Sequence, residues 1–254
     1  MIKLPRRSIH SLYPLALAEG EGVGTAYEYF AKRLALAPWL AGLPNPKSML
    51  VAGLPEKYGS SLDFFLLAQD LSVPEVVVCD DRPSALEKAG QSIARAQAAG
   101  QLTGLKTRSV LINDFSRIGE ELGVFDLCVT SEMLQRLNRN TQEVVNALTR
   151  TARSLALFAP NADNPAHNQL SGLAGLSLDE LQSMVGQPAR VGYVDMPPFP
   201  PGLTRNSSQR QQASSGWMER LAMSGLDNYA RLERFTALRL RKRRSHIVYA
   251  LVSR

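Results

Sequence analysis

Short apolar runs alternate with longer amphipathic segments along the first 160 residues. Runs rich in Val, Leu and Ile, bounded by Gly, Pro or Asp, predict buried strands at 48–52, 75–79, 109–112, 125–130 and 155–158. Between them, the segments 60–70, 83–99 and 140–153 carry apolar residues at helical spacing and predict helices. Strands this apolar, alternating with helices, predict a parallel sheet covered on both faces. Right-handed crossovers then favour a doubly wound α/β fold.

The pattern changes on either side of this core, which we place at 47–160. Residues 24–37 lack helix breakers and predict a helix within an N-terminal helical extension over 1–46. Residues 197–244 predict a loop and helix insertion before a final strand. Since the chain shows no internal repeat and no separable second unit, we expect one domain over 1–254.

Composition and charge add two constraints. The 254 residues are 44% hydrophobic and 20% charged, enough for a full core in one α/β domain. The formal net charge is +6, but five basic residues lie within 239–244, so the basicity is local. This run could hold nucleic-acid phosphates, an anionic lipid surface or an acidic substrate, or it could be a solvated helix end.

Cysteine, histidine and apolar-run patterns exclude several classes. Cys79 and Cys128 lie inside apolar runs, where reduced thiols pack as small hydrophobic groups. No Cys or His pair has ligand spacing, so we expect no metal site. No run approaches the roughly 20 apolar residues of a membrane span. Pro14 interrupts the run Leu12–Ala18, so we expect no signal peptide and a cytoplasmic location.

In a doubly wound sheet, ligands bind outside the carboxyl ends of the strands, near the point where strand order reverses. After the strand at 48–52 the chain continues through Gly53, Leu54 and Pro55 to Gly59. Glycines allow a tight turn and close approach of backbone to ligand, and the next helix offers N–H groups without partners. The glycine spacing fits neither a phosphate-binding P-loop nor a dinucleotide fingerprint.

Polar residues also follow the next strands. Asp80 and Asp81 end the second, where a carboxylate can accept hydrogen bonds from a ribose diol. Asp114 can accept from an exocyclic amine, beside Phe115, which offers an aromatic surface to a purine. Helix capping is the alternative for both carboxylates of the second strand, and core packing is the alternative for Phe115. The fourth strand is followed by Ser131 and Glu132.

The stretch 48–137 resembles the core of class I S-adenosylmethionine-dependent methyltransferases. Val-Val-Val-Cys-Asp80-Asp-Arg-Pro-Ser-Ala-Leu is similar to the family's second motif, with Asp80 matching the acidic residue that holds the ribose hydroxyls. Phe125-Asp-Leu-Cys-Val-Thr is similar to its fourth-strand segment. The first loop departs from the family's Gly-x-Gly-x-Gly turn, because Gly53 is followed by no second glycine until Gly59.

The resemblance implies a Rossmann-like sheet of seven strands, mostly parallel, with the segments at about 190–195 and 246–252 forming an antiparallel C-terminal edge. It also implies S-adenosyl-L-methionine as the cofactor. The residues expected to hold it are Gly53, Leu54, Pro55, Gly59, Asp80, Asp81, Asp114, Phe115 and Ser131.

The segment after the fifth strand is where this fold commonly places contacts to the methyl acceptor. We expect a small-molecule acceptor near Tyr29, Glu132, Asn161 and Phe199. His167 is a candidate general base, although a surface-loop histidine is the more frequent case. Methyl transfer to a nucleophilic acceptor needs little acid–base help, so the sequence compels no catalytic residue.

Two other functions stay open. A methyltransferase-like domain that has lost turnover could serve as a binding or assembly module, and the missing loop glycines favour this hypothesis. The basic run 239–244, with Arg241, Arg243 and Arg244, could instead guide methylation of RNA or of a protein partner. Nucleic-acid binding is not favoured, because no known RNA- or DNA-binding module accompanies the run.

Overall fold

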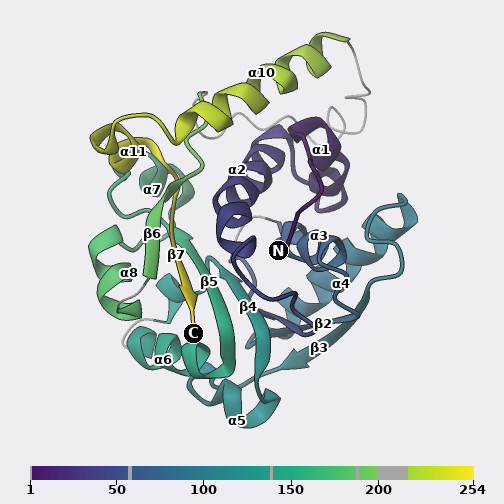
Figure 1. Ribbon diagram of the computed structural model, residues 1–254, viewed down its shortest axis with the longest axis vertical. Helices are drawn as coiled ribbons and strands as arrows, with labels where there is room; N and C mark the ends of the chain where they lie inside the picture. The colour runs from purple at the N-terminus through teal and green to yellow at the C-terminus, as the bar shows by residue number, and fades with distance from the viewer. Residues whose placement is uncertain (1, 57–58, 138–139, 187–188, 199–216) are drawn as a thin grey trace.

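The structure, a computed structural model, describes residues 2–56, 59–137, 140–186, 189–198 and 217–254. Helices cover both faces of one sheet that runs through the molecule (Figure 1). In chain order the elements are α1 Ile9–Ala18, α2 Val23–Leu40, β1 Met49–Ala52, α3 Leu62–Asp70, β2 Glu75–Asp80, α4 Pro83–Ala98, β3 Lys106–Leu111, η1 Phe115–Arg117, α5 Ile118–Leu122, β4 Phe125–Ser131, η2 Leu134–Arg136, α6 Thr141–Thr151, β5 Ala152–Pro160, α7 Pro165–Ser171, α8 Leu178–Val185, β6 Ala189–Val194, α10 Trp217–Glu233, α11 Leu238–Arg244 and β7 Ile247–Ser253.

The sheet has seven strands in the order β3-β2-β1-β4-β5-β7-β6. β1 lies between β2 and β4 and runs parallel to both, so the strand order reverses there. β7 runs antiparallel to β5, with Ile247 opposite Pro160, and antiparallel to β6 on its other side. This order confirms the predicted Rossmann-like sheet, mostly parallel with an antiparallel C-terminal strand. β7 is inserted between β5 and β6, so β6 forms the outer edge.

Both faces of the central strands are buried, which explains their continuous apolar sequences. In β1, Met49 and Val51 join the core on one face, and Leu50 and Ala52 join the core on the other. This alternation follows from the two-residue period of a strand. The face that contains Met49 is covered by helices that include α1 to α4 and α10, and the opposite face is covered by α5, α6 and α8.

The structure differs from the predicted elements where the apolar signal is weak. β3 starts at Lys106 rather than 109, because it is the edge strand beside β2 and its side chains are mostly exposed. α1 was not predicted, since Pro14 lies inside it. Proline removes one backbone donor and disfavours a helix interior, but the buried residues of α1 hold it on the core.

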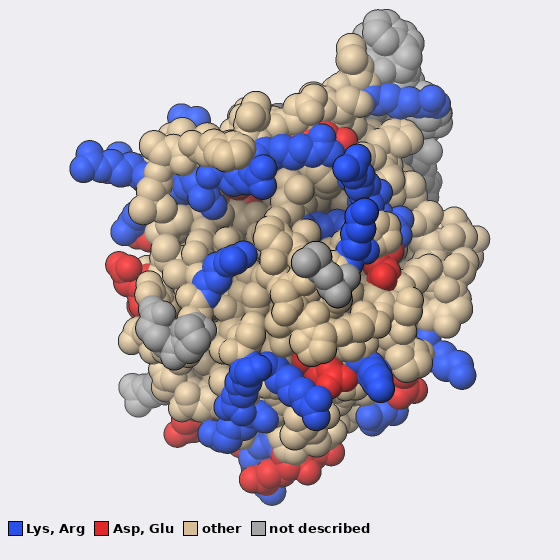
Figure 2. All heavy atoms as spheres, in the orientation of Figure 1, with Lys and Arg blue, Asp and Glu red and all other residues tan. Residues whose placement is uncertain are grey.

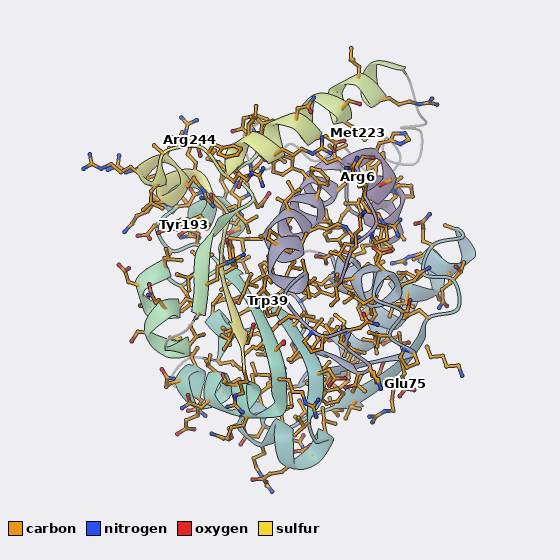
Figure 3. All side chains as sticks on the ribbon, in the orientation of Figure 1. Arg6, Trp39, Glu75, Tyr193, Met223 and Arg244 are labelled. Atoms are coloured by element: carbon orange, nitrogen blue, oxygen red, sulfur yellow. The ribbon has the colours of Figure 1, made fainter. Side chains whose placement is uncertain are left out.

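Side chains fill the space between α2 and the sheet around the labelled Trp39, and the space between α10 and the helices α1 and α2 around the labelled Met223 (Figure 3). Trp39 of α2 donates its indole N–H to Ser253 Oγ at 2.7 Å, which ties α2 to the end of β7. Cys79 and Cys128 are free buried thiols. Among the described helices, none has the length and apolar character needed to cross a membrane.

Candidate functional site

The turn after β1 packs directly on the residues after β4. Gly53 has a φ of +75°, in the left-handed region that favours glycine. Its N–H donates to the Cys79 carbonyl oxygen at 2.7 Å, and a Cβ at this position would collide with the Met133 side chain. The first loop glycine is therefore required both for its conformation and for this close approach.

Asp80, at the end of β2, is fully buried and is the centre of a hydrogen-bond cluster. Its Oδ2 accepts from the Leu54 N–H at 2.7 Å, which joins the β1 turn to β2. Arg82 donates to both carboxylate oxygens, from Nε at 2.8 Å and from Nη2 at 3.0 Å. Burial would raise the pKa of Asp80, but the hydrogen bonds from Arg82 and Leu54 and the charge of Arg136 lower it below its ordinary value. The carboxylate is therefore ionised.

Arg136 connects three of the predicted site residues. Its Nη2 donates to Asp80 Oδ2 at 3.2 Å, and its Nη1 lies 2.6 Å from Asp81 Oδ1. The guanidinium group lies over the Phe115 ring, 5.7 Å from its centroid. The structure thus brings Asp80, Asp81 and Phe115 together, with Arg136 between them. Asp114 differs: it is exposed and accepts from the Ser116 N–H at 2.8 Å, which caps η1.

The types of these residues suit an adenosine ligand, but their present arrangement leaves no place for it on Asp80. A buried carboxylate, a glycine turn and an aromatic ring are suited to a ribose and an adenine. However, Asp80 already accepts from Leu54 N, from the backbone and side chain of Arg82 and from Arg136, and a carboxylate offers only about four acceptor positions. A ribose can therefore reach Asp80 only after a guanidinium group, such as that of Arg136, has turned away.

The backbone amides after the loop are also occupied. Glu19 accepts from the Ser60 N–H at 2.9 Å and from the Leu62 N–H at 2.6 Å, at the start of α3. Glu21 accepts from the Gly59 N–H at 3.2 Å. Burial raises the pKa of Glu19 to about 7. Carboxylates from the segment between α1 and α2 thus take the amides that we expected to face a ligand.

A buried lysine gathers polar groups from three elements at the same edge of the sheet. Lys32 of α2 is 1% exposed, and its Nζ lies 2.6 Å from Glu28 Oε1 and 3.6 Å from Asp63 Oδ2. It also donates to Ser131 Oγ at 3.3 Å and lies over the Phe64 ring. Burial lowers the pKa of Lys32, but the charges of Asp63 and Glu28 more than offset this and raise it. Ser131 therefore contacts Lys32, whereas Asp80 contacts Arg82 and Arg136, which together we call the arginine cluster.

Two carboxylate residues at this edge have strained backbones. Glu132 follows β4 with a φ of +54°, and Asp195 follows β6 with a φ of +67°. Side chains other than glycine rarely adopt this region, and such strain concentrates at functional sites. Burial and the charge of Glu28 raise the pKa of Glu132 to about 8. Its Oε2 is buried and has no hydrogen-bond partner among the residues that the structure describes.

The two histidines at this edge stack on each other. The ring centroids of His167 and His246 are 4.1 Å apart, and His246 Nδ1 lies 3.0 Å from Asp195 Oδ2. Burial and the charge of His246 lower the pKa of His167 to about 4. A histidine proposed as a general base is expected to titrate near neutrality, whereas His167 is an uncharged ring at pH 7. Its role as a general base stays a prediction.

The other predicted acceptor contacts are placed differently. Asn161 is fully buried, and its side-chain amide donates to the carbonyl oxygens of Lys242 and Ser245 at 2.8 and 2.9 Å. Its Oδ1 accepts from the Asp163 N–H, so this side chain holds the segment before β7 and leaves only the second lone pair of Oδ1 for an acceptor. Tyr29 is buried in the core, where its hydroxyl group is near the Glu19 carboxyl and partly offsets the rise that burial causes in the pKa of that carboxyl. Phe199 lies outside the described residues.

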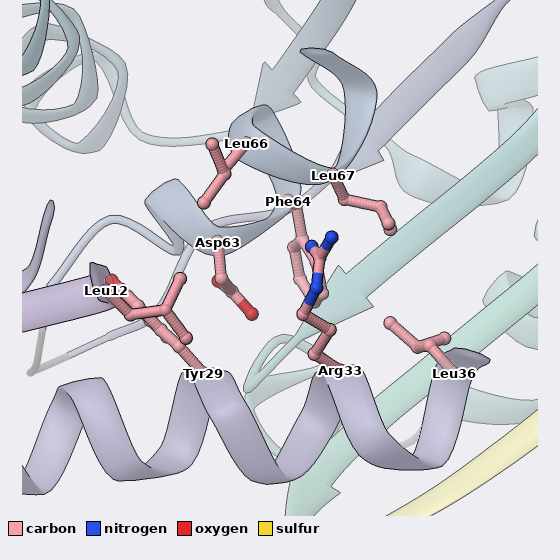
Figure 4. A pocket seen from close by; sticks show the side chains of 8 residues that line it. All are labelled: Leu12, Tyr29, Arg33, Leu36, Asp63, Phe64, Leu66 and Leu67. Carbon is pink, nitrogen blue, oxygen red and sulfur yellow. The ribbon is translucent and has the colours of Figure 1, made fainter. Parts of the chain in front are cut away.

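Two cavities lie away from the β1 loop. One lies between α2 and α3, and its lining includes Tyr29, Arg33 and Asp63 (Figure 4). Its volume is about 10 Å³, which has room for about one water molecule. The other, of about 330 Å³, lies at the amino ends of β4 and β5, beside Asp126 and Arg153. Neither is lined by residues of the β1 loop.

No family model matches this chain, and no curated protein matches it. Solved structures are similar to it. A chain in the complex between the Haloferax volcanii Trm112 methyltransferase activator and a putative methyltransferase is 12% identical, with a TM-score of 0.51 and coverage of 94% of this chain and 93% of that chain. The plantazolicin methyltransferase BpumL in complex with SAH is 15% identical, with a TM-score of 0.48 and coverage of 97% and 89%. The methyltransferase domain of bacterial CtHen1 is 17% identical, with a TM-score of 0.45 and coverage of 64% and 90%.

The first of these likenesses extends over nearly the whole of both chains. Together with the strand order, it shows that the chain has the class I methyltransferase fold. This confirms the resemblance that the sequence carries. At 12% identity the likeness concerns the fold, and the activity has to be argued from the site.

Proposed function

We propose that the protein binds S-adenosyl-L-methionine at the carboxyl edge of the sheet and transfers its methyl group to a small-molecule acceptor. The observation that carries this proposal is Asp80, a buried and ionised carboxylate at the end of β2, where the strand order reverses. The reversal itself is at β1, next to β2, and Asp80 adjoins the left-handed turn at Gly53 that follows β1 and lies near Phe115 through Arg136. Ligands of doubly wound folds bind at this position.

In this proposal, Asp80 accepts the ribose hydroxyls once Arg136 has turned away. Phe115 offers its ring to the adenine, and Gly53 allows the backbone to approach closely. When bound, S-adenosylmethionine would supply a methyl group bonded to a sulfonium sulfur, and S-adenosylhomocysteine would be the leaving group when a nucleophile takes that methyl group in line. The protein's contribution is to position the acceptor and to exclude water, because proximity supplies much of the rate in such reactions.

The acceptor side is formed by the polar groups around Lys32. Glu132 is the candidate for removing a proton from the acceptor, because its buried Oε2 has no partner in the described part of the chain and its pKa is raised to about 8. It carries negative charge mainly above that pH. Its Oε2 is buried near Glu28 and Lys32 of α2, and such a position favours a small acceptor over a macromolecule.

The alternative is a domain that has lost turnover and acts in binding or assembly. The specific observation in its favour is the saturated carboxylate of Asp80, since Arg82 and Arg136 fill its acceptor positions. The similar Haloferax complex contains a methyltransferase activator, and an assembly partner for this chain is compatible with either function.

Thermal unfolding with added ligands tests the proposal. S-adenosylmethionine and S-adenosylhomocysteine at 100 times their dissociation constants should each stabilise the protein by about 2.7 kcal/mol. For a domain of this size, that raises the unfolding temperature by roughly 5 to 10 °C. NAD and ATP should give no such shift.

Matched variants decide what the result means. Asp80→Asn should abolish the shift, while Asp179→Asn on the exposed start of α8 should leave it unchanged. Because Asp80→Asn also weakens the arginine cluster, each variant is first checked for cooperative unfolding. A wild-type protein that responds to neither adenosyl ligand contradicts the proposal and favours the non-catalytic function.

A further inference from the structure

Exposed apolar side chains are concentrated where α10 leads into α11. Eight large hydrophobic side chains are exposed in the described part of the chain, and four of them lie between 232 and 240. They are Leu232, Phe235, Leu238 and Leu240, with exposed fractions of 62%, 72%, 64% and 41%. We call residues 231–244 the α10–α11 corner.

Basic side chains surround these apolar groups. The exposed ones in the corner are Arg231, Arg234, Arg239, Lys242, Arg243 and Arg244. The acidic residue within the corner, Glu233, is buried and accepts a hydrogen bond from Tyr27 at 2.7 Å. Arg241 is also turned inward and donates to the Tyr193 carbonyl oxygen. Figure 2 shows the Lys and Arg side chains gathered over α11, and Figure 3 labels Arg244 there.

The corner projects from the molecule at the carboxyl edge of the sheet. α11 leads directly into β7, whose first residue pairs with Pro160 at the end of β5 (Figure 1). The described residues leave its four large apolar side chains largely exposed. Leaving a large apolar side chain in water rather than burying it costs about 1.5 to 3 kcal/mol, and a cluster of such groups marks an interaction site.

We propose that the α10–α11 corner docks on an anionic lipid surface. Leu and Phe side chains enter the boundary between headgroups and acyl chains, while Arg and Lys bind lipid phosphates. This combination distinguishes a lipid surface from RNA. A protein that binds the phosphates of RNA needs basic side chains but gains little from exposed leucines. The docking is independent of the proposed methyl transfer.

Sedimentation with lipid vesicles tests the docking. The protein should bind vesicles of phosphatidylcholine mixed with phosphatidylserine, bind pure phosphatidylcholine weakly, and release as salt rises. The double variant Phe235→Ser/Leu238→Ser should bind at least about tenfold more weakly. Arg243→Glu/Arg244→Glu should bind anionic vesicles at least about fivefold more weakly for each arginine replaced.

Matched variants elsewhere on the surface are the controls. Val124→Ser/Leu111→Ser removes exposed apolar groups, and Lys106→Glu/Arg108→Glu reverses exposed charges, both outside the corner. Both should bind anionic vesicles like the wild type, and thermal unfolding should show all variants folded.

Three results would overturn the docking proposal. The first is equal binding to the two kinds of vesicle. The second is a Phe235→Ser/Leu238→Ser variant that binds as the wild type does, together with competition by a single-stranded RNA oligonucleotide. The third is a dimer in gel filtration that the same variant abolishes, which would mean that a second copy of the chain covers the corner.

Discussion

Replacing Lys32 by methionine should destabilise the protein strongly, and more so as pH rises. Methionine keeps much of the length and apolar stem of lysine, so the change chiefly removes the ammonium group. That group lies 2.6 Å from a Glu28 oxygen and 3.6 Å from an Asp63 oxygen, and the Asp63 side chain is 8% exposed. Without Lys32, these carboxylates keep their burial but lose their nearest counter-charge.

The expected loss in the free energy of unfolding can be worked out from these distances. With an effective dielectric constant of about 20, the two attractions amount to about 6 and 5 kcal/mol before desolvation is subtracted. Breaking a buried pair by removing one partner costs about 3 to 5 kcal/mol. Burial raises the pKa of both Glu28 and Asp63, and the charge of Lys32 opposes that rise. In the variant, both carboxyls therefore bind protons more readily, and the cost should shrink at acidic pH.

Urea denaturation followed by circular dichroism at about pH 5.5 and about pH 8 measures this cost. Lys106→Met, on an exposed position of β3, is the matched control and should change the free energy of unfolding by less than about 0.5 kcal/mol. If Lys32→Met lowers the free energy of unfolding by less than about 1 kcal/mol at pH 8, or by the same amount at both pH values, Lys32 is not the counter-charge that Glu28 and Asp63 need.

Three further predictions concern the β1 loop and its neighbours. Burial raises the pKa of Glu19 from its ordinary value of 4.5 to about 7, so its contribution to stability is complete below about pH 4.5 and is lost as pH rises through 7. In urea denaturation, Glu19→Gln should remove about 3 kcal/mol of this pH dependence. Gly53→Ala should cost about 2 to 4 kcal/mol in thermal unfolding, from the left-handed backbone and the collision with Met133, and Gly100→Ala, with the same φ of +75° but open space, should cost less. Arg136→Ala should bind S-adenosylhomocysteine about tenfold more tightly in isothermal titration, because the ligand no longer displaces a guanidinium group; weaker binding would show that Arg136 contacts the ligand.

The sequence predicts the central strands because burial on both faces leaves a continuous apolar run. Residues 49–52 are apolar throughout and fully buried, and the predicted strand matches β1 closely. β3 gives a weaker signal, since Lys106, Thr107 and Arg108 lie on an edge strand and face water. Local patterning cannot distinguish such an edge strand from a loop.

The position of Asp80 is predicted because it depends on one strand end, whereas its partners depend on the whole fold. Arg136 lies 56 residues further along the chain and reaches Asp80 only because the sheet places β4, and the segment after it, one strand away from β2. Lys32 shows the same limit. Its spacing of four residues from Glu28 is typical of a surface ion pair on a helix, and nothing local indicates that α2 turns this lysine toward the sheet.

A crystal structure of the protein with S-adenosylhomocysteine shows directly whether Asp80 holds the ribose of the ligand. We expect the ribose hydroxyls within hydrogen-bond distance of Asp80, Arg136 turned away from that carboxylate, and the adenine against Phe115. A ligand bound elsewhere, or a saturated crystal in which Arg136 still lies on Asp80 and no ligand is bound, would contradict it.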